Sequence, residues 1–314
     1  MIVVAGEALI DLVPAPGTAP DTAGSATEPG SPGALLPRRG GGPYNTALAL
    51  GRLGSRTAFC SRVSSDRFGT DLLRGLRADG VDTTLVQRGP EPTTLAVAEI
   101  GEDGSAGYRF YVEGTADRLF ELPGPLPGDV RALSLGTCSL VLEPGAGAYE
   151  ALLRRESARG VFTTLDPNIR ADLITDPDAY RERFRSWLPY VGLLKLSAED
   201  AAWLGGDPAE WAAAGPGAVV VTRGGEGLTV LTRSGTWSVP AERADVVDTI
   251  GAGDTVNAAL LHRLATRHDA LAPGALEKLG AEAWRDVLGY AARAAAVTCS
   301  RRGAQPPYAS EIGD

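Results

Sequence analysis

Short apolar runs alternate with longer segments of helical period along most of this chain of 314 residues. The run Ile2–Ala5, apolar and β-branched at consecutive positions, is typical of a strand buried on both faces. Alternating strands and helices predict a parallel sheet covered by helices on both sides. We therefore expect an α/β fold with a doubly wound, mostly parallel sheet flanked by helices, whose ligands bind at the carboxyl ends of the strands.

The expected elements follow one another from end to end. Strands are predicted at residues 2–5, continuing through 7–13, and at 57–63, 131–135, 161–166, 190–196 and 218–222, with a hairpin at 228–231 and 236–239 and a strand-like stretch at 246–247. Helices are predicted at residues 44–53, 69–78, 148–159, 178–187, 198–204, 254–265 and 281–299.

Two segments interrupt this alternation. Residues 14–37 are rich in proline, glycine, alanine, serine and threonine, and we expect them to be irregular. Residues 94–100 and 108–112 have the pattern of a two-stranded ribbon with a turn at 102–105. The ribbon is predicted to belong to a small β element beside the main sheet.

Composition excludes several classes of protein. The formal net charge is -9 and no run of lysine or arginine occurs, which argues against a nucleic-acid partner. No apolar run reaches the roughly 18 residues of a membrane span, and the N-terminus lacks the pattern of a signal peptide. Three distant cysteines without a CxxC pair fit reduced thiols in a cytoplasmic protein. The chain has only two histidines, which are close together, so chemistry that needs several histidine ligands or a Ser-His-Asp triad is disfavoured. Carboxylates, hydroxyls and backbone amides remain as the catalytic groups.

The most informative motif covers residues 248–254, Asp-Thr-Ile-Gly-Ala-Gly-Asp, directly before a predicted helix. Gly251, Ala252 and Gly253 allow a tight turn, and a helix N-terminus presents unpaired N–H groups that suit a phosphate. Asp254 at this place can accept a proton from an attacking hydroxyl. The alternative is that Asp254 only caps its helix.

A second glycine-rich turn opens the helix at 44–53. Gly41 and Gly42 can bring the backbone against a ligand, and Asn45 offers the donor and acceptor that a sugar needs. The alternative is a tight turn with Asn45 in the first helical turn. Asp11, among apolar neighbours, needs a partner, which is either a sugar hydroxyl or a structural arginine.

Three further strand ends carry polar groups. Residues 166–170 suggest contact with substrate or phosphate, or a loop held by an Asp–Arg pair. Residues 222–227 form a cradle for nucleotide phosphates or the start of a hairpin. Lys195, one of two lysines in the chain, stands at a strand end with acids one turn on, and the alternative is a solvated helix start.

Taken together, these motifs resemble the ribokinase-like (PfkB) carbohydrate kinases, and within them the bacterial fructokinases. Residues 6–11 are similar to the family's opening strand, residues 41–45 to its first signature and residues 249–255 to its second, which is highly specific. By this resemblance Asp254 is the catalytic base, and Gly251, Ala252 and Gly253 form the anion hole. ATP is the implied co-substrate, with Mg²⁺.

The resemblance also implies the other site residues. The sugar-binding residues are Asp11, Gly41, Gly42, Asn45, Phe110, Asn168 and Arg170. The nucleotide-binding residues are Lys195, Ser197, Thr222, Gly224, Gly225 and Gly227. Asp200 stands where the family usually has glutamate and implies a magnesium contact through water, while Asp248 and residues 301–306 imply a potassium site.

The family fold divides the chain into two parts. Residues 1–13, 40–93 and 116–314 are expected to form the domain that binds nucleotide and sugar. Residues 14–39 and 94–115 are expected to form a small β lid, whose closure excludes water from the reaction. By family analogy, two copies of the chain pair through their lids.

The leading hypothesis is transfer of the γ-phosphoryl group of ATP to a primary hydroxyl of a small sugar, with fructose favoured. A 2-keto-3-deoxygluconate kinase, in which Arg170 would meet a carboxylate, and a ribokinase are the alternatives within the family. A sugar- or nucleotide-binding regulator without catalysis is the alternative outside enzymes. A dehydrogenase is disfavoured because no G-x-G-x-x-G follows the first strand.

Overall fold

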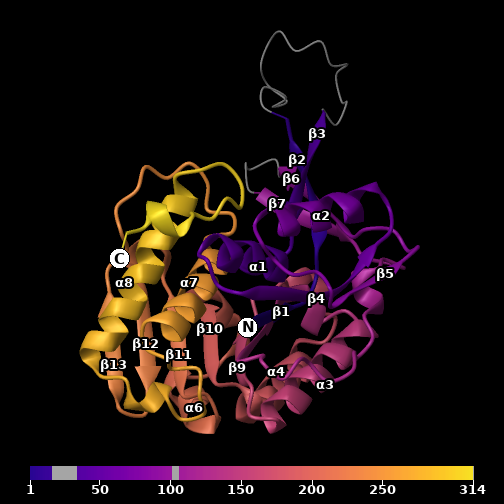
Figure 1. Ribbon diagram of the computed structural model, residues 1–314. Coiled ribbons are helices and arrows are strands. Elements are labelled where there is room, and N and C mark those ends of the chain that lie inside the picture. Colours follow the sequence, from indigo (N-terminus) through magenta and orange to yellow (C-terminus); the bar gives the residue numbers. More distant parts are fainter. Residues whose placement is uncertain (16–33, 101–105, 314) are drawn as a thin grey trace.

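A computed structural model describes residues 1–15, 34–100 and 106–313, and it confirms the predicted fold class. The larger sheet has the strand order β13-β12-β11-β10-β9-β8-β1-β4-β5, and its pairs are parallel except that β12 pairs antiparallel with both β11 and β13 (Figure 1). Its strands are β1 (Ile2–Ala5), β4 (Thr57–Ser64), β5 (Val86–Gly89), β8 (Ala132–Gly136), β9 (Phe162–Asp166), β10 (Leu193–Ser197), β11 (Ala218–Thr222), β12 (Leu228–Thr232) and β13 (Gly235–Val239).

Helices cover both faces of this sheet. They are α1 (Gly42–Arg52), α2 (Arg67–Ala78), α3 (Gly145–Ala158), α4 (Pro177–Trp187), α5 (Ala198–Leu204), α6 (Pro208–Ala214), α7 (Ala252–Thr266) and α8 (Ala281–Cys299). Single 3₁₀ turns lie at Asp117–Leu119, Thr137–Leu140, Ala171–Leu173, Leu188–Tyr190, Gly224–Glu226, Leu276–Lys278 and Ala309–Glu311. Within the described residues, none of the helices has the length and apolarity needed to cross a membrane.

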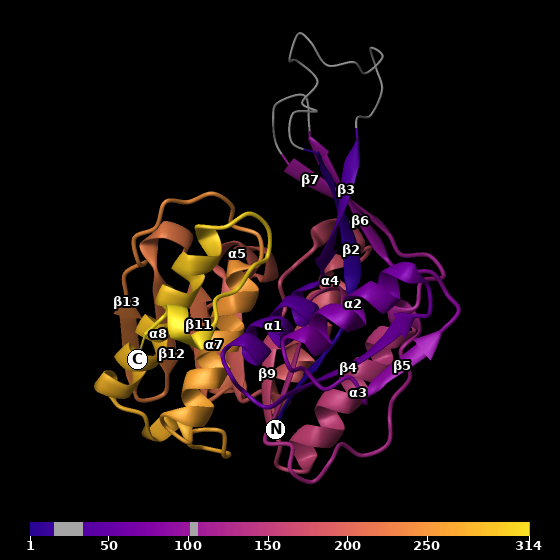
Figure 2. The same cartoon turned by 45° about the horizontal axis from the view of Figure 1, so that its top comes forward.

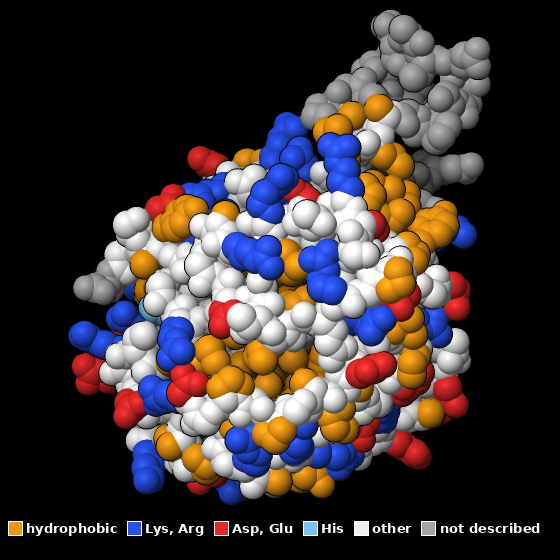
Figure 3. Space-filling view, turned by 45° about the vertical axis from the view of Figure 1, so that its right-hand side comes forward, with side chains coloured by type: hydrophobic (Ala, Val, Ile, Leu, Met, Phe, Trp, Pro, Cys, Tyr) orange, Lys and Arg blue, Asp and Glu red, His pale blue; other side chains and the backbone are white. Residues whose placement is uncertain are grey.

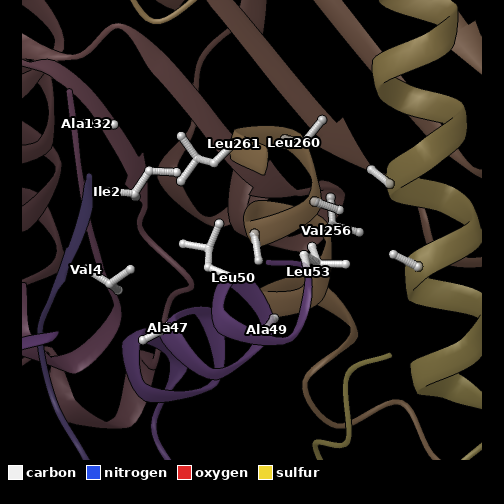
Figure 4. Close-up of a cluster of buried hydrophobic side chains, with 14 of the residues drawn as sticks. Ile2, Val4, Ala47, Ala49, Leu50, Leu53, Ala132, Val256, Leu260 and Leu261 are labelled. Carbon is white, nitrogen blue, oxygen red and sulfur yellow. The ribbon is translucent and has the colours of Figure 1, made fainter. Parts of the chain in front are cut away.

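The buried strands explain why the sequence runs are apolar throughout. Ile2 and Val4 of β1 belong to the core under α1, α7 and α8, where they lie near Leu50 (Figure 4). Val3 and Ala5 point to the opposite face and belong to the second core, together with side chains of α3 and α4. Successive side chains of a strand face opposite sides of the sheet, so a strand covered on both faces carries no polar alternation.

The smaller sheet has the order β3-β2-β6-β7 and projects from one end of the molecule (Figure 2). Its strands are β2 (Leu9–Pro14), β3 (Leu35–Gly40), β6 (Leu95–Ile100) and β7 (Ala106–Tyr111). The β6–β7 ribbon matches the predicted small β element, and β2 and β3 complete the lid.

Several local predictions were wrong. The first strand does not continue through residue 13, because the chain leaves the large sheet at Gly6 and enters the small one at Leu9. Part of the segment predicted as irregular forms β3, which pairs with β2. The proline-rich composition of the segment gave no sign of this pairing. Residues 16–33 of the segment lie outside the described part of the chain. Residues 246–247 form no strand, and β5 and α6 were missed.

Candidate active site

A cavity of about 250 Å³ lies between the small sheet and the carboxyl ends of β8 and β9. The starts of α1 and α7 close its floor, as expected for a ligand site at the strand ends of a doubly wound sheet. Ten of the predicted residues line it: Asp11, Gly41, Gly42, Asn45, Phe110, Asn168, Arg170, Gly251, Gly253 and Asp254. Segments more than 240 residues apart in the sequence therefore meet at one place.

Asp254 lies in the first turn of α7 with its side chain buried. The Nδ2 atom of Asn45 donates a hydrogen bond of 2.9 Å to its Oδ2 atom. The helix cap is Gly251, without a side-chain cap, so the alternative in which Asp254 serves as the cap is wrong. Burial raises the pKa of Asp254 to about 6, although the hydrogen bond from Asn45 acts in the opposite direction.

The turn before Asp254 needs glycine for two reasons. Gly251 has φ of 77°, and a Cβ atom there would lie 2.6 Å from the Cβ of Ala304. The N–H groups of Gly251 and Gly253 have no acceptor among the residues that the structure describes. These groups and the positive end of the α7 dipole form an environment suited to an anion. Ala252 begins α7 without lining the cavity.

Asp11 approaches the cavity from β2 of the small sheet. Burial, and then repulsion by the Asp254 carboxylate, raises the pKa of Asp11 to about 6, while Arg170 opposes the change. A Cβ atom on Gly40 would collide with the Asp11 carboxylate, so the glycine on the neighbouring strand leaves the space that this carboxylate occupies. No structural arginine bonds Asp11 among the described residues, which leaves its oxygens available to a ligand.

Arg170 is held by the loop that follows β9. Its Nη1 atom donates to the backbone oxygen of Asn168 at 3.0 Å, to the Asn168 Oδ1 atom at 2.8 Å and to the backbone oxygen of Ile169 at 3.0 Å. The alternative of an Asp–Arg pair in this loop is wrong, because Asp166 bonds Lys195 instead. Arg170 is thereby fixed as the cation of the cavity wall.

Comparison with known proteins gives this geometry a context. Residues 1–311 match the model of the pfkB family of carbohydrate kinases. The chain belongs to this family. The kinase is 41% identical to a fructokinase of Rhizobium leguminosarum bv. trifolii over 84% of this chain and 79% of the relative.

Solved structures agree with this membership. A fructokinase from Xylella fastidiosa with bound ATP is 27% identical, with a TM-score of 0.84 and coverage of 99% of this chain and 96% of that chain. A fructokinase from Vibrio cholerae O395 in a fructose, ADP and calcium ion bound form is 25% identical, with a TM-score of 0.76 and coverage of 96% and 94%. The fold of the kinase is thus shared over nearly the whole chain.

Lys195 of the kinase lies beneath the cavity and does not line it. Its Nζ atom is 2.7 Å from the Oδ2 atom of Asp166, and both side chains are almost fully buried. The alternative of a solvated helix start is therefore wrong. Burial acts to lower the pKa of Lys195, but the Asp166 carboxylate outweighs it and the pKa is raised, so the ammonium stays charged. A Cβ atom on Gly253 would lie 3.0 Å from this Nζ.

The acidic motif after β10 has a structural role in the kinase. Ser197 caps α5: its Oγ atom accepts from the Asp200 N–H at 2.9 Å, and the Asp200 Oδ2 atom accepts from the Ser197 N–H at 3.1 Å. The Oδ1 atom of Asp200 accepts from the Ile169 N–H at 2.8 Å. Both Asp200 oxygens thus bind the backbone, and the magnesium contact through water stays a prediction.

The remaining predicted nucleotide residues lie apart from the cavity, between β11 and β12. Thr222 ends β11, and Gly224 and Gly227 have φ of 51° and 101° in the turn that follows. A Cβ atom on Gly227 would collide with the backbone of Val239, so this glycine also serves the hairpin that the alternative reading proposed. Gly225 is exposed with open space around it.

The loop before α7 contacts the segment after α8. Oδ1 of Asp248 accepts from the Ile250 N–H at 3.0 Å, and Oδ2 accepts from the Gly303 N–H at 2.8 Å. The two sequence segments implied in a potassium site are therefore neighbours. Within the described part of the chain, no three His, Cys, Asp or Glu residues form a cluster that could hold a metal ion.

Sequence reasoning assigned no site role to seven residues that line the cavity: Glu7, Leu9, Tyr108, Thr137, Cys138, Thr249 and Ile250. Thr137 and Cys138 directly follow β8, a strand end that carried no glycine-rich or acidic motif. Their position after Gly136 was the available signal, since every strand of a parallel sheet ends at the ligand edge. Burial raises the pKa of Glu7 to about 7.

Proposed function

We propose that the kinase transfers the γ-phosphoryl group of ATP to a primary hydroxyl of fructose. The observation that carries the proposal is the buried Asp254 carboxylate at the N-terminus of α7, beside N–H groups of Gly251 and Gly253 that lack acceptors in the described residues. Such a site pairs a base for the hydroxyl with donors for the transferring phosphoryl group.

The transfer follows from these groups. The sugar hydroxyl loses its proton to Asp254 as its oxygen bonds the γ-phosphorus, and the bond from that phosphorus to the bridging oxygen of ADP breaks. The N–H groups of Gly251 and Gly253 donate to the phosphoryl oxygens on which charge gathers, whereas the Ala252 N–H already donates to the backbone oxygen of Thr249. Asp11, Asn45 and Arg170, together with the backbone at Gly41 and Gly42, orient the sugar.

The charge of the cavity supports a neutral sugar. The carboxylates of Glu7, Asp11 and Asp254 line it, and Arg170 is the cation among the lining residues. The acceptors that hold the Nη1 atom of Arg170 satisfy part of its charge. A sugar acid would place a further negative charge beside these carboxylates, which disfavours ketodeoxygluconate. The names of the relatives, fructokinases throughout those described above, support fructose.

We further propose that Mg²⁺ accompanies ATP and neutralises its phosphates. Since the described residues offer no cluster of metal ligands, the ATP phosphates and water would hold most of this ion. The adjacency of Asp248 and Gly303 supports a potassium site at that loop. Thr222, the glycines at 224, 225 and 227, and Ser197 remain the proposed nucleotide contacts, with Lys195 acting from below.

Pairing of two copies through the lid and a cytoplasmic location stay predictions. Hydrophobic side chains gather on the small sheet on the face shown in Figure 3. Leu35 of β3 and Tyr111 of β7, on the two outer strands, are 36% and 55% exposed. An exposed apolar surface of this kind supports contact with a second copy of the chain.

A panel of sugars tests the proposed function. ATP consumption is measured with fructose, ribose, glucose and 2-keto-3-deoxygluconate, with the Asp254→Asn variant as the control for background hydrolysis. We expect fructose to give the highest kcat/KM, by at least tenfold over the sugar acid. A higher kcat/KM with ribose or the sugar acid would contradict fructose as the substrate. Sugar binding without turnover would contradict catalysis and favour a sugar-binding regulator.

The pH profile offers a second test. The base must be deprotonated to act, so kcat/KM should fall as pH decreases through about 6, where Asp254 and Asp11 titrate. Because the two carboxylates repel each other, their protons are released over a wider pH range than those of independent groups, and kcat/KM should change by less than tenfold per pH unit near pH 6. In the Asp11→Asn variant, Asp254 titrates without this repulsion, and kcat/KM should fall by tenfold per pH unit below pH 6. Constant kcat/KM between pH 7 and 5, with the fold intact by fluorescence, would contradict the assignment.

A further inference from the structure

Backbone strain is concentrated beside the proposed base. Among the described residues, the positive-φ residues other than glycine are Thr137 at 62°, Asn168 at 38° and Asp269 at 47°. Thr137 and Asn168 both line the cavity, whereas Asp269 lies in the exposed loop after α7. A β-branched residue such as threonine is disfavoured in this region, so the surrounding structure must hold Thr137 in place.

The strained conformation directs the Thr137 side chain to one point. An ideal Cβ position on Gly42 lies 2.5 Å from the Thr137 Oγ1 atom and 3.3 Å from both the Asn168 Nδ2 and Asp254 Oδ1 atoms. Polar atoms from three elements therefore converge over a residue that has no side chain. Absence of a side chain at such a point lets another molecule approach the backbone closely.

The hydrogen bonds of Thr137 are incomplete. Its side chain is buried, with 5% of the residue exposed. The Oγ1 atom accepts a long contact of 3.4 Å from the Asn168 Nδ2 atom, and no acceptor for its own hydroxyl hydrogen exists among the described residues. A buried donor without an acceptor is unfavourable, and a hydroxyl oxygen of a bound sugar would satisfy it.

We propose that Thr137 is a specificity-determining contact to the sugar, which rests on the proposed function. Its hydroxyl donates to a sugar oxygen next to the hydroxyl that Asp254 deprotonates, and its strained backbone fixes the direction of that donor. The strained conformation is unfavourable in the free protein, but it fixes a donor that distinguishes one sugar from another.

Matched substitutions at this position separate the hydroxyl from the strain. Thr137→Val keeps the shape and the β-branch but removes the hydroxyl, and we expect kcat/KM for fructose to fall about tenfold to a hundredfold, with the KM of ATP unchanged. Thr137→Ser keeps the hydroxyl and should stay within about threefold of the natural protein. Thr137→Gly relieves the strain, so it should melt at the same or a higher temperature and lose as much kcat/KM as valine does.

Deoxy analogues of fructose identify the contacted oxygen. The analogue that lacks it should bind the natural protein more weakly, yet should bind Thr137→Val and the natural protein equally. Asp269→Gly, which relieves strain outside the cavity, is the control and should leave sugar kinetics unchanged. Fructose kinetics of Thr137→Val within twofold of the natural protein would overturn the proposal. Calorimetry measures sugar binding without ATP, so it tests the Thr137 contact even if the protein shows no turnover. Failure of this proposal can therefore be distinguished from failure of the proposed function.

Discussion

Asp254→Asn should reduce kcat with fructose by about three to four orders of magnitude while the KM values change little. The amide keeps the shape of the side chain and can still accept the hydrogen bond from Asn45, but it cannot take the proton of the sugar hydroxyl. The measurement is a steady-state assay of ADP release with fructose and ATP both varied. Turnover within tenfold of the natural protein would rule out Asp254 as the base.

The stability of the same variant gives an independent readout. The pKa of Asp254 in the folded protein is raised to about 6, above its value in the unfolded chain, so the unfolded chain releases this proton more readily. The group therefore destabilises the fold progressively as pH rises through about 6. Asparagine does not ionise, and at pH 7 Asp254→Asn should be more stable by up to about 3 kcal/mol. A less stable variant would show that the carboxylate serves the fold.

Those two readouts distinguish the base from a structural acid because a structural carboxylate is normally paired. Glu156 illustrates the difference: it is fully buried and bonds both Arg155 and Arg159. Asp254 has a neutral partner, Asn45, and no cation bonded to it among the described residues. A buried carboxylate without a bonded cation is held at a cost to the fold, as expected when it is retained for catalysis.

The fold and half of the site could be read from the sequence for identifiable reasons. Strands such as β1 and β11 are buried on both faces, so local composition alone marks them. Asp254 and Asn45 follow glycines at helix starts, and that chemistry is also local. By contrast, β3 contains a proline and two arginines and is a strand only because β2 lies beside it.

Pairings between distant segments limited the rest of the prediction. The sequence offered Asp166 and Arg170 as partners four residues apart, whereas Asp166 bonds Lys195 across neighbouring strands. Thr137 carried no motif, because its importance lies in a backbone angle and in the nearness of Gly42. Both features are properties of the assembled sheet edge.

Lys195→Met should lower the free energy of unfolding by about 3 to 5 kcal/mol, because it leaves the Asp166 carboxylate buried without its cation. The two side chains are only 4% and 7% exposed, so water cannot replace the lost partner. The Oδ1 atom of Asp166 already has no hydrogen-bond partner within the described residues, which leaves Lys195 as the bonded partner of this charge. Urea unfolding at pH 7 measures the change.

Two further variants decide whether the loss comes from the unpaired charge. Lys195→Met combined with Asp166→Asn removes both charges and should recover more than half of the lost stability. Lys278→Met changes the only other lysine of the chain, which is exposed, and should alter stability by less than about 0.5 kcal/mol. If the double variant were as unstable as Lys195→Met, the loss would reflect packing of the lysine stem. The Nζ atom of Lys195 lies 3.0 Å from the ideal Cβ position of Gly253. If the double variant recovered stability but not kcat, the Lys195 charge would belong to the groups that stabilise the transferring phosphoryl group.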